Sequence, residues 1–233
     1  MHAMANIDVI IPAFNEEQSI PLVLNDIPDF VRQIIVVNNN SIDRTAIAAA
    51  ESGAHVVDQP DQGYGNACLK GIETLKSLDT PPDIVVFLDA DYSDHPEEMN
   101  RLVEPILYGD VDFVVGSRAL GEREKGSMMP QQRFGNWLAT FMVKLLYKRK
   151  ITDLGPFRAI KFQQLMDLDM KDQTFGWTIE MQLKAIKKNY KYQEVPVSYR
   201  KRIGRSKITG TVKGTILAGY KIIGTIINLR YKS

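Results

Sequence analysis

Residues 85–99 read VVFLDADYSDHPEEM and join an apolar run directly to a pair of aspartates. Apolar residues without polar alternation are typical of a strand buried on both faces of a parallel sheet. Asp89 and Asp91 follow at once, and two carboxylates at the end of a buried strand cost free energy unless a positive group faces them. The stretch therefore predicts an interior strand whose end meets a metal ion, a helix N-terminus or basic side chains.

Strand-like and helix-like segments alternate through the first half of the chain. Strands are predicted over 7–11, 33–37, 55–58, 84–88 and 113–116. Helices are predicted over 16–26, 43–52, 65–77 and 96–107. Repeated strand–helix units of this length predict an α/β fold, in which a mostly parallel sheet is flanked by helices.

The second half of the chain is less regular. Its patterns predict amphipathic helices over 133–147 and 177–188 and a strand over 192–199. We expect one domain over residues 1–208 and a C-terminal amphipathic helix over 209–233. This helix either packs on the domain or on a second subunit, or it lies on a membrane surface.

Composition narrows the class of protein. The 233 residues include 29 Lys and Arg against 28 Asp and Glu, and this balance argues against nucleic-acid binding. Cys68 is the only cysteine, which excludes an intramolecular disulfide and favours a reducing compartment. The N-terminal residues lack a signal-peptide pattern, and no run approaches the roughly 18 apolar residues of a membrane-spanning helix. We expect a cytoplasmic protein, soluble or peripheral to a membrane.

Polar residues at three strand ends are expected to form one crevice, because ligands of such sheets bind outside the carboxyl ends of the strands. These residues are 38–40, 89–91 and 117–118. Asp89 and Asp91 are two apart, so both point to one side and suit a divalent cation completed by phosphate oxygens and water. The alternative is that Asp91 or Ser93 caps the helix predicted after Pro96.

Residues 61–72, DQGYGNACLKGI, form a glycine-containing link between a predicted strand and a predicted helix. The spacing partly matches a dinucleotide-binding loop. Against that interpretation, Cys68 stands where the third glycine would be, and the loop follows the third strand rather than the first. The alternative is that Gly63 and Gly65 permit a tight turn and a close approach of backbone.

Basic residues gather late in the chain. The cluster consists of Arg118, Arg133, Arg158, Arg200, Lys201, Arg202, Arg205 and Lys207. Such runs are commonly a solvated surface. Gly204 and Ser206 within the run indicate a loop, however, and loops with Arg and Ser suit bidentate phosphate binding. Carboxylates, a cation and several arginines together favour a diphosphate ligand.

Seven segments lie in order along nearly the whole chain: IIPAFNEE (10–17), VVNNNSIDRT (36–45), GYGNACLKG (63–71), LDADYSDHPEEM (88–99), GSR (116–118), DLGPFRA (153–159) and EVPVSYRKRIGRSK (194–207). Together they resemble the family 2 glycosyltransferases of the GT-A fold, and among them the dolichol- and polyprenyl-phosphate sugar transferases.

The resemblance implies a nucleotide-sugar pocket with a metal ion at its diphosphate end. The pocket would be lined by Pro12, Asn15, Glu17, Asn39, Gly65 and Ala90. Asp89 and Asp91 would hold Mg²⁺ or Mn²⁺ against the diphosphate, with Ser93 as a further ligand. Asn38 and Asn39 stand where the family has paired aspartates, and an amide side chain offers the nucleotide base both a hydrogen-bond donor and an acceptor.

The resemblance also assigns basic residues to phosphates. Arg118 and Arg133 would meet an acceptor phosphate. The donor diphosphate would be covered by Arg202, Ser206 and Lys207. Residues 154–157 replace the family's usual SGF segment, so the acceptor end departs from the family pattern.

The implied reaction is a single displacement that inverts the anomeric carbon and moves a sugar from a UDP- or GDP-sugar to a polyprenyl or dolichyl phosphate. A phosphate acceptor, with a second pKa of about 6, needs no protein base. A hydroxyl of a glycan, lipid or small molecule would need a carboxylate, with Asp153 and Glu180 as candidates. A nucleotide-sugar binding protein without catalysis remains a further alternative, and the oligomeric state, including a homo-oligomer, stays open.

Overall fold

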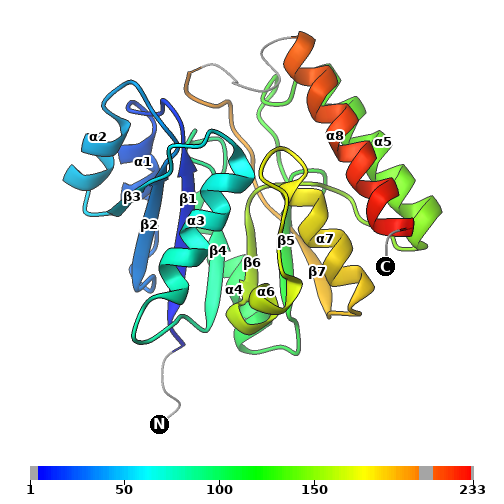
Figure 1. Ribbon diagram of the computed structural model, residues 1–233, viewed down its shortest axis with the longest axis horizontal. Helices are drawn as coiled ribbons and strands as arrows, with labels where there is room; N and C mark the ends of the chain where they lie inside the picture. Colours follow the sequence, from blue (N-terminus) through cyan, green and yellow to red (C-terminus); the bar gives the residue numbers. More distant parts are fainter. Residues whose placement is uncertain (1–4, 205–211, 232–233) are drawn as a thin grey trace.

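The computed structural model describes residues 5–204 and 212–231, which form a seven-stranded sheet with helices on both faces (Figure 1). The strand order is β3-β2-β1-β4-β6-β5-β7. The strands are β1 (Ile7–Ala13), β2 (Gln33–Asn38), β3 (His55–Asp58), β4 (Ile84–Phe87), β5 (Phe113–Ser117), β6 (Arg158–Lys161) and β7 (Tyr192–Pro196). Strand β6 is antiparallel to both neighbours, and the other strand pairs are parallel. The expected α/β fold with a mostly parallel sheet is confirmed.

Strand β6 was not predicted, although it lies between β4 and β5. Its four residues, RAIK, lack the apolar run that marks β4. Pairing on both sides makes them a strand, since Ile160 lies opposite both Val85 and Phe113. The series of parallel strands expected from the first half of the chain is therefore interrupted by a strand from the second half.

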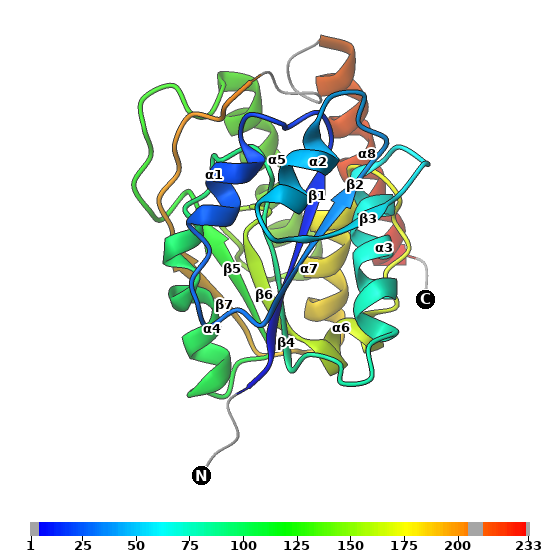
Figure 2. The ribbon, with the colours of Figure 1, turned by 90° about the vertical axis from the view of Figure 1, so that its left-hand side faces the viewer.

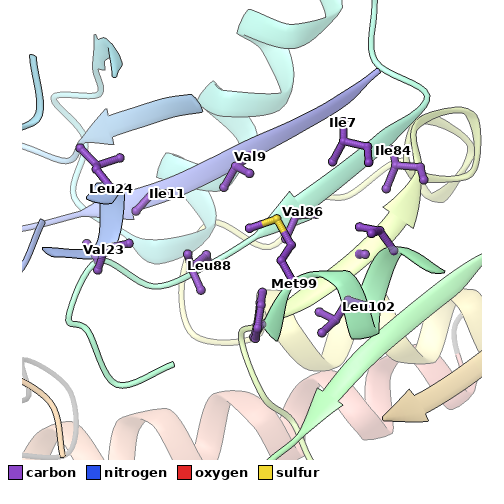
Figure 3. Packing of buried hydrophobic residues seen from close by; sticks show 14 of the residues in the cluster. Ile7, Val9, Ile11, Val23, Leu24, Ile84, Val86, Leu88, Met99 and Leu102 are labelled. Atoms are coloured by element: carbon purple, nitrogen blue, oxygen red, sulfur yellow. The ribbon is translucent and has the colours of Figure 1, made fainter. Parts of the chain in front are cut away.

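Helices cover both faces of the sheet. They are α1 (Ile20–Asn25), α2 (Thr45–Glu51), α3 (Tyr64–Lys76), α4 (Asn100–Leu107), α5 (Pro130–Tyr147), α6 (Phe162–Leu168), α7 (Trp177–Lys187) and α8 (Val212–Tyr231). Because alternate strand residues point to opposite faces, Val9 and Val86 pack with α1, α2 and α4, whereas Ile10 and Phe87 pack with α3, α6 and α7. Figure 2 shows these helices on opposite sides of the sheet, and Figure 3 shows part of the core under α1 and α4.

Some element boundaries differ from those expected. Helix α1 begins after Glu16, because the Glu16 N–H donates to Thr45 Oγ1 at 2.8 Å and holds this residue in the preceding loop. The helix expected over 96–107 is a 3₁₀ turn, Pro96–Glu98, followed by α4. Strand β7 ends before the expected Tyr199.

Helix α8 lies beside α5 at one end of the sheet (Figure 1) and also contacts α7. Ile226 is buried between these helices, and its carbonyl oxygen accepts a hydrogen bond from Tyr147 Oη at 2.9 Å. Arg230 Nε donates to the Leu146 carbonyl oxygen at 2.9 Å. In the part of the chain that is described, no helix is long and apolar enough to cross a bilayer. The expected division at 208/209 falls outside the described residues and stays a prediction.

Candidate active site

A pocket of about 400 Å³ opens at the carboxyl ends of β1, β2 and β4, the upper edge of the sheet in Figure 1. These strands are parallel neighbours, so the residues that follow them converge at one edge. The lining residues are Pro12, Ala13, Phe14, Glu16, Asn39, Gln62, Gly63, Tyr64, Asp89, Ala90, Asp91, Thr174, Phe175 and Arg202. Of the residues expected at the nucleotide, Pro12, Asn39 and Ala90 line this pocket directly.

Asp89 follows β4 and lines the pocket with a poorly compensated carboxylate. Its Oδ1 is buried and has no hydrogen-bond partner among the described residues. Burial, and then the neighbouring charge of Asp91, raise the pKa of Asp89 to about 7, although a hydrogen bond with Tyr64 and the charge of Arg202 act in the opposite direction. A carboxylate in such surroundings is stabilised by a cation.

Asp91 is buried and well partnered. Its Oδ2 lies 3.0 Å from Arg202 Nη1, and its Oδ1 accepts hydrogen bonds from the backbone N–H and the hydroxyl of Ser93. These bonds turn the chain at Ser93, three residues before the 3₁₀ turn that begins at Pro96 with His95 as its N-cap. The alternative in which Asp91 or Ser93 caps a helix is therefore wrong.

The aspartate pair suits a hard divalent cation. Within residues 5–204 and 217–231, no group of three His, Cys, Asp or Glu side chains is placed to enclose an ion. Mg²⁺ commonly binds through one or two carboxylates and takes its other ligands from phosphates and water. The unpartnered Oδ1 of Asp89, beside the carboxylate of Asp91, fits a cation that shares its shell with a diphosphate.

Arg202 connects the aspartate pair to the loop after β1. Its Nη2 lies 2.8 Å from Glu16 Oε1, while its Nη1 contacts Asp91. Glu16 therefore faces the crevice, whereas the carboxylate of the expected Glu17 accepts the Arg44 N–H at 2.9 Å. Two further residues expected at the diphosphate lie outside the described residues: Ser206 and Lys207.

Asn39 lines the pocket, but its amide bonds the loop that leads to α3. Its Oδ1 accepts the Gly63 N–H at 2.8 Å, and its Nδ2 donates to the carbonyl oxygens of Gln59 at 3.1 Å and Asp61 at 2.8 Å. Asn15 Oδ1 likewise accepts a backbone N–H of the β2–α2 loop at 2.8 Å. Both amides thus shape the loops around the pocket.

The glycines of the 61–72 segment bring α3 against the loop before α7. A Cβ on Gly63 would lie 2.2 Å from the Gln173 carbonyl oxygen, and a Cβ on Gly65 would lie 2.0 Å from the Asp172 carbonyl oxygen. The Asn66 N–H in the first turn of α3 donates to the Gln173 carbonyl oxygen at 2.9 Å. The glycines therefore serve a close backbone approach, which argues against a dinucleotide phosphate at this helix N-terminus.

Arg118, expected at the acceptor phosphate, forms a bidentate ion pair with Asp153. Nε and Nη2 lie 2.8 Å from Oδ2 and Oδ1, and the Arg118 N–H donates to Oδ2 at 2.8 Å. The guanidinium also lies 5.0 Å from the ring centroid of Tyr199. Burial acts to raise the pKa of Asp153, but the charge and hydrogen bonds of Arg118 outweigh it and hold this pKa below its usual value.

A second pocket of about 270 Å³ adjoins the first and lies between α5 and α8. Tyr64, Asp89 and Phe175 line both pockets, and Arg118 contributes a positive charge to the second. The rest of its lining is mostly apolar and includes Leu138, Ala139, Leu154, Pro156, Ala218, Ile222 and Ile223. The crevice therefore continues from the carboxylates into an apolar compartment.

Arg158, counted among the basic residues that suit phosphate binding, is buried in the protein. It is 0% exposed and donates hydrogen bonds to the carbonyl oxygens of Gly155 and Thr178. Its guanidinium also lies 5.8 Å from the ring centroid of Phe113. Two predictions for Arg158, that it binds phosphate and that it lies on a solvated surface, are therefore wrong. Its hydrogen bonds instead connect the chain before β6 to α7.

Two other candidates lie outside the two adjoining pockets. Glu180, considered as a base, is buried against Lys184 with Oε1 2.7 Å from Nζ, and it accepts the backbone N–H groups of residues 171 and 172. Arg133, expected at the acceptor phosphate, is exposed and lines a smaller pocket that includes Asp153. The structure thus brings Arg118, but not Arg133, to the apolar compartment.

Several pocket residues were not predicted. They are Ala13, Phe14, Glu16, Gln62, Tyr64, Thr174 and Phe175. Asp94 does not line the pocket but is a further buried carboxyl, and both of its oxygens lack a partner in the described part of the chain. Burial, and then the charge of Asp89, raise the pKa of Asp94 well above the usual value. For Glu16, the adjacent acidic pair Glu16 and Glu17 was a signal in the sequence. No local signal marks residues 174 and 175, because their loop reaches the pocket through its contact with α3.

Relatives match most of the chain. It is 34% identical over 214 residues to an uncharacterised glycosyltransferase of Mycobacterium tuberculosis. The aligned residues cover 91% of this chain and 94% of the relative. It is 29% identical over 229 residues to a dolichyl-phosphate hexose transferase of Haloferax volcanii, and the aligned residues cover 96% of this chain and 95% of that relative. It is 27% identical over 218 residues to an undecaprenyl-phosphate mannosyltransferase of Micrococcus luteus, with 88% of each covered.

A solved structure shares the fold. Glucosyl-3-phosphoglycerate synthase from Mycobacterium tuberculosis, in complex with Mn²⁺, UDP and phosphoglyceric acid, matches with a TM-score of 0.78 at 23% identity over 97% of this chain and 79% of that one. The same enzyme was also solved with Mg²⁺ and UDP, and that structure matches with a TM-score of 0.73. The expected GT-A fold is thereby confirmed.

The family model for glycosyl transferase family 2 matches residues 8–168. This range runs from β1 to α6 and includes Asp89, Asp91 and Arg118. The match covers well over half of the chain, and the mycobacterial relative extends the likeness beyond α6. The protein therefore belongs to glycosyl transferase family 2 and is a glycosyltransferase.

Proposed function

We propose that the protein transfers a sugar from a UDP- or GDP-sugar to the phosphate of a polyprenyl phosphate. The main support is that a pocket lined by carboxylates and Arg202 continues into a mostly apolar pocket to which Arg118 adds a positive charge. A polyprenyl phosphate has a matching anionic head and apolar tail, and arginine is well suited to bind phosphate. The relatives named for undecaprenyl and dolichyl phosphate support this acceptor class.

On the donor side, Asp89 and Asp91 would hold Mg²⁺ or Mn²⁺, which would supply Lewis-acid stabilisation of the leaving diphosphate. Arg202, whose Nη1 lies 3.0 Å from Asp91 Oδ2, is placed to offset the negative charge that grows there. Pro12 and Asn39 would shape the nucleotide end of the pocket. The related fold solved with Mn²⁺ and UDP supports this assignment.

On the acceptor side, the lipid phosphate would attack the anomeric carbon directly and invert its configuration. With a second pKa of about 6, a phosphate monoester is largely dianionic at neutral pH and needs no protein base. Arg118 would position it, because Asp153 holds the guanidinium through two hydrogen bonds. A hydroxyl acceptor fits less well, since the lowered pKa of Asp153 and its bonds to Arg118 make it a weak base.

A transfer assay tests the proposal. Labelled UDP- and GDP-hexoses are offered with Mn²⁺ and either a polyprenyl phosphate in detergent or phosphoglyceric acid as acceptor. We expect label in the lipid only, and a loss of about a hundredfold or more in Asp91→Asn. Asp79→Asn, a change at an exposed residue, is the matched control. Transfer to phosphoglyceric acid but not to the lipid, or no transfer from either donor class, would contradict the proposal.

A further inference from the structure

Helix α5 carries a row of large apolar side chains on one exposed face. Four residues form this row, named here the α5 stripe: Phe134, Trp137, Phe141 and Leu145. They are 50–66% exposed, and their spacing places them on one side of the helix. Ring centroids lie 5.8 Å apart both from Phe134 to Trp137 and from Trp137 to Phe141. The opposite side of α5 is buried through Ala139 and Val143, so the α5 stripe is not part of the core.

Positive charge accompanies the α5 stripe. Residues 130–150 contain five basic and no acidic residues: Arg133, Lys144, Lys148, Arg149 and Lys150. These five residues are exposed. Residues 212–231, which form the adjacent α8, contain three basic and no acidic residues. Of the three, Lys221 is paired with Asp172 at 3.0 Å, so the positive charge beside the α5 stripe comes mainly from residues 130–150, in a chain balanced at 29 basic against 28 acidic residues.

We infer that the α5 stripe docks on the surface of an anionic lipid bilayer. Exposed aromatic rings with basic residues beside them fit a helix that lies in the membrane interface, where the rings enter the acyl boundary and the cations meet anionic headgroups. A second copy of the chain fits less well as the partner. A twofold pairing of two α5 stripes would place the basic margins of both copies against each other.

The apolar pocket adjoins this face of the molecule. Gln131, Gly135 and Leu138 of α5 line the pocket, and they alternate along the helix with the residues of the α5 stripe. Docking of the stripe therefore brings the pocket between α5 and α8 next to the lipid, in reach of a phosphate carried on a membrane-held chain. This consequence rests on the proposed function, whereas the docking itself is measured without any transfer reaction.

The test uses the full-length protein and vesicles free of polyprenyl phosphate. Vesicles of phosphatidylcholine, with or without about a third phosphatidylglycerol, are compared at low and high salt. Trp137 is 57% exposed and Trp177 is 0% exposed, and the chain has two tryptophans, so emission changes report on the α5 stripe. We expect co-sedimentation and a blue shift of emission with anionic vesicles, both reduced by salt.

The double variant Phe134→Ala, Phe141→Ala should lower the bound fraction by about tenfold, because two rings are removed from the interface while Trp137 remains as the probe. Tyr108→Ala is the matched control, since Tyr108 is an aromatic residue 86% exposed at the end of α4. Unchanged binding by the double variant, or no binding by the wild type, would overturn the inference. A dimer that the double variant dissociates would assign the stripe to a second copy instead. Nucleotide-sugar binding with Mn²⁺, measured separately, distinguishes these results from a failure of the proposed function.

Discussion

Two aspartates, one lining the crevice and one paired with an arginine of its wall, have opposite electrostatic surroundings. Asp89 has a buried oxygen without a hydrogen-bond partner among the described residues and a pKa raised to about 7. Asp153 forms a bidentate pair with Arg118, and its pKa is lowered. Such a contrast separates a carboxylate that needs a ligand from one that positions a neighbour. At the scale of the residue, this contrast supports the proposal that Asp89 binds the metal ion and that Asp153 positions Arg118.

Replacing Asp89 should stabilise the metal-free protein. A pKa raised from 3.8 to about 7 means that the folded state keeps a proton that the unfolded chain loses, so stability falls as the pH rises between these values. In EDTA, Asp89→Asn should raise the melting temperature by roughly 3 °C or more near pH 8, and by less near pH 5. Differential scanning fluorimetry measures this. A variant no more stable than the wild type near pH 8 would show that Asp89 is already compensated.

At the scale of the element, the crevice depends on how closely α3 approaches the loop before α7. Gly65 lies where a Cβ would meet the Asp172 carbonyl oxygen at 2.0 Å, and the Asn66 N–H bonds the next residue of that loop. This contact brings Thr174 and Phe175 to the pocket wall. The glycine is needed for the approach of two backbone segments that are distant in sequence.

Gly65→Ala should therefore lower both stability and nucleotide affinity. The new Cβ forces the loop away from α3, at a cost of about 1–3 kcal/mol. Gly224→Ala is the matched control in α8, where a Cβ would meet nothing within 4 Å and a helical alanine should add about 0.5–1 kcal/mol. Urea denaturation gives the free energies, and calorimetric titration with nucleotide and Mn²⁺ gives the affinity. Equal stability of Gly65→Ala and wild type would refute the close approach.

At the scale of the whole molecule, the crevice joins elements from both halves of the chain. The ends of β1, β2 and β4 form the carboxylate-lined pocket together with Arg202, and α5 and α8 enclose the apolar pocket. Because β6 of the second half lies between β4 and β5 of the first, the two halves share one sheet. Ligand binding at the crevice should therefore stabilise the molecule as a unit.

Nucleotide binding should stabilise the folded protein only when the metal is present. A ligand at a hundred times its Kd adds about 2.7 kcal/mol of stability, which corresponds to roughly 5–10 °C for a chain of this size. We expect such a shift for UDP and its sugars or for GDP and its sugars with Mn²⁺, and its loss in EDTA. Thermal-shift measurements across both nucleotide classes check this. An equal shift in EDTA would contradict a shared metal and diphosphate site.

Features that depend on neighbours along the chain could be predicted from the sequence. The apolar run before Asp89, the strand–helix alternation and the placement of polar residues at strand ends predicted the mostly parallel sheet and the crevice at its edge. These predictions succeed because periodicity and strand polarity are local, and parallel strands then place their ends together. The same local pattern did not distinguish Glu16 from Glu17, since adjacent residues of an irregular loop follow no fixed period.

Features that depend on contacts between distant residues became visible in the folded molecule alone. The segment RAIK becomes the interior strand β6 because β4 and β5 pair with it, and Arg158 is buried because the Gly155 and Thr178 carbonyl oxygens accept its hydrogen bonds. Arg118 and Asp153, 35 residues apart, meet as one ion pair. A charge pattern shows that basic side chains are present, but long-range packing decides which of them face a ligand and which hold the fold.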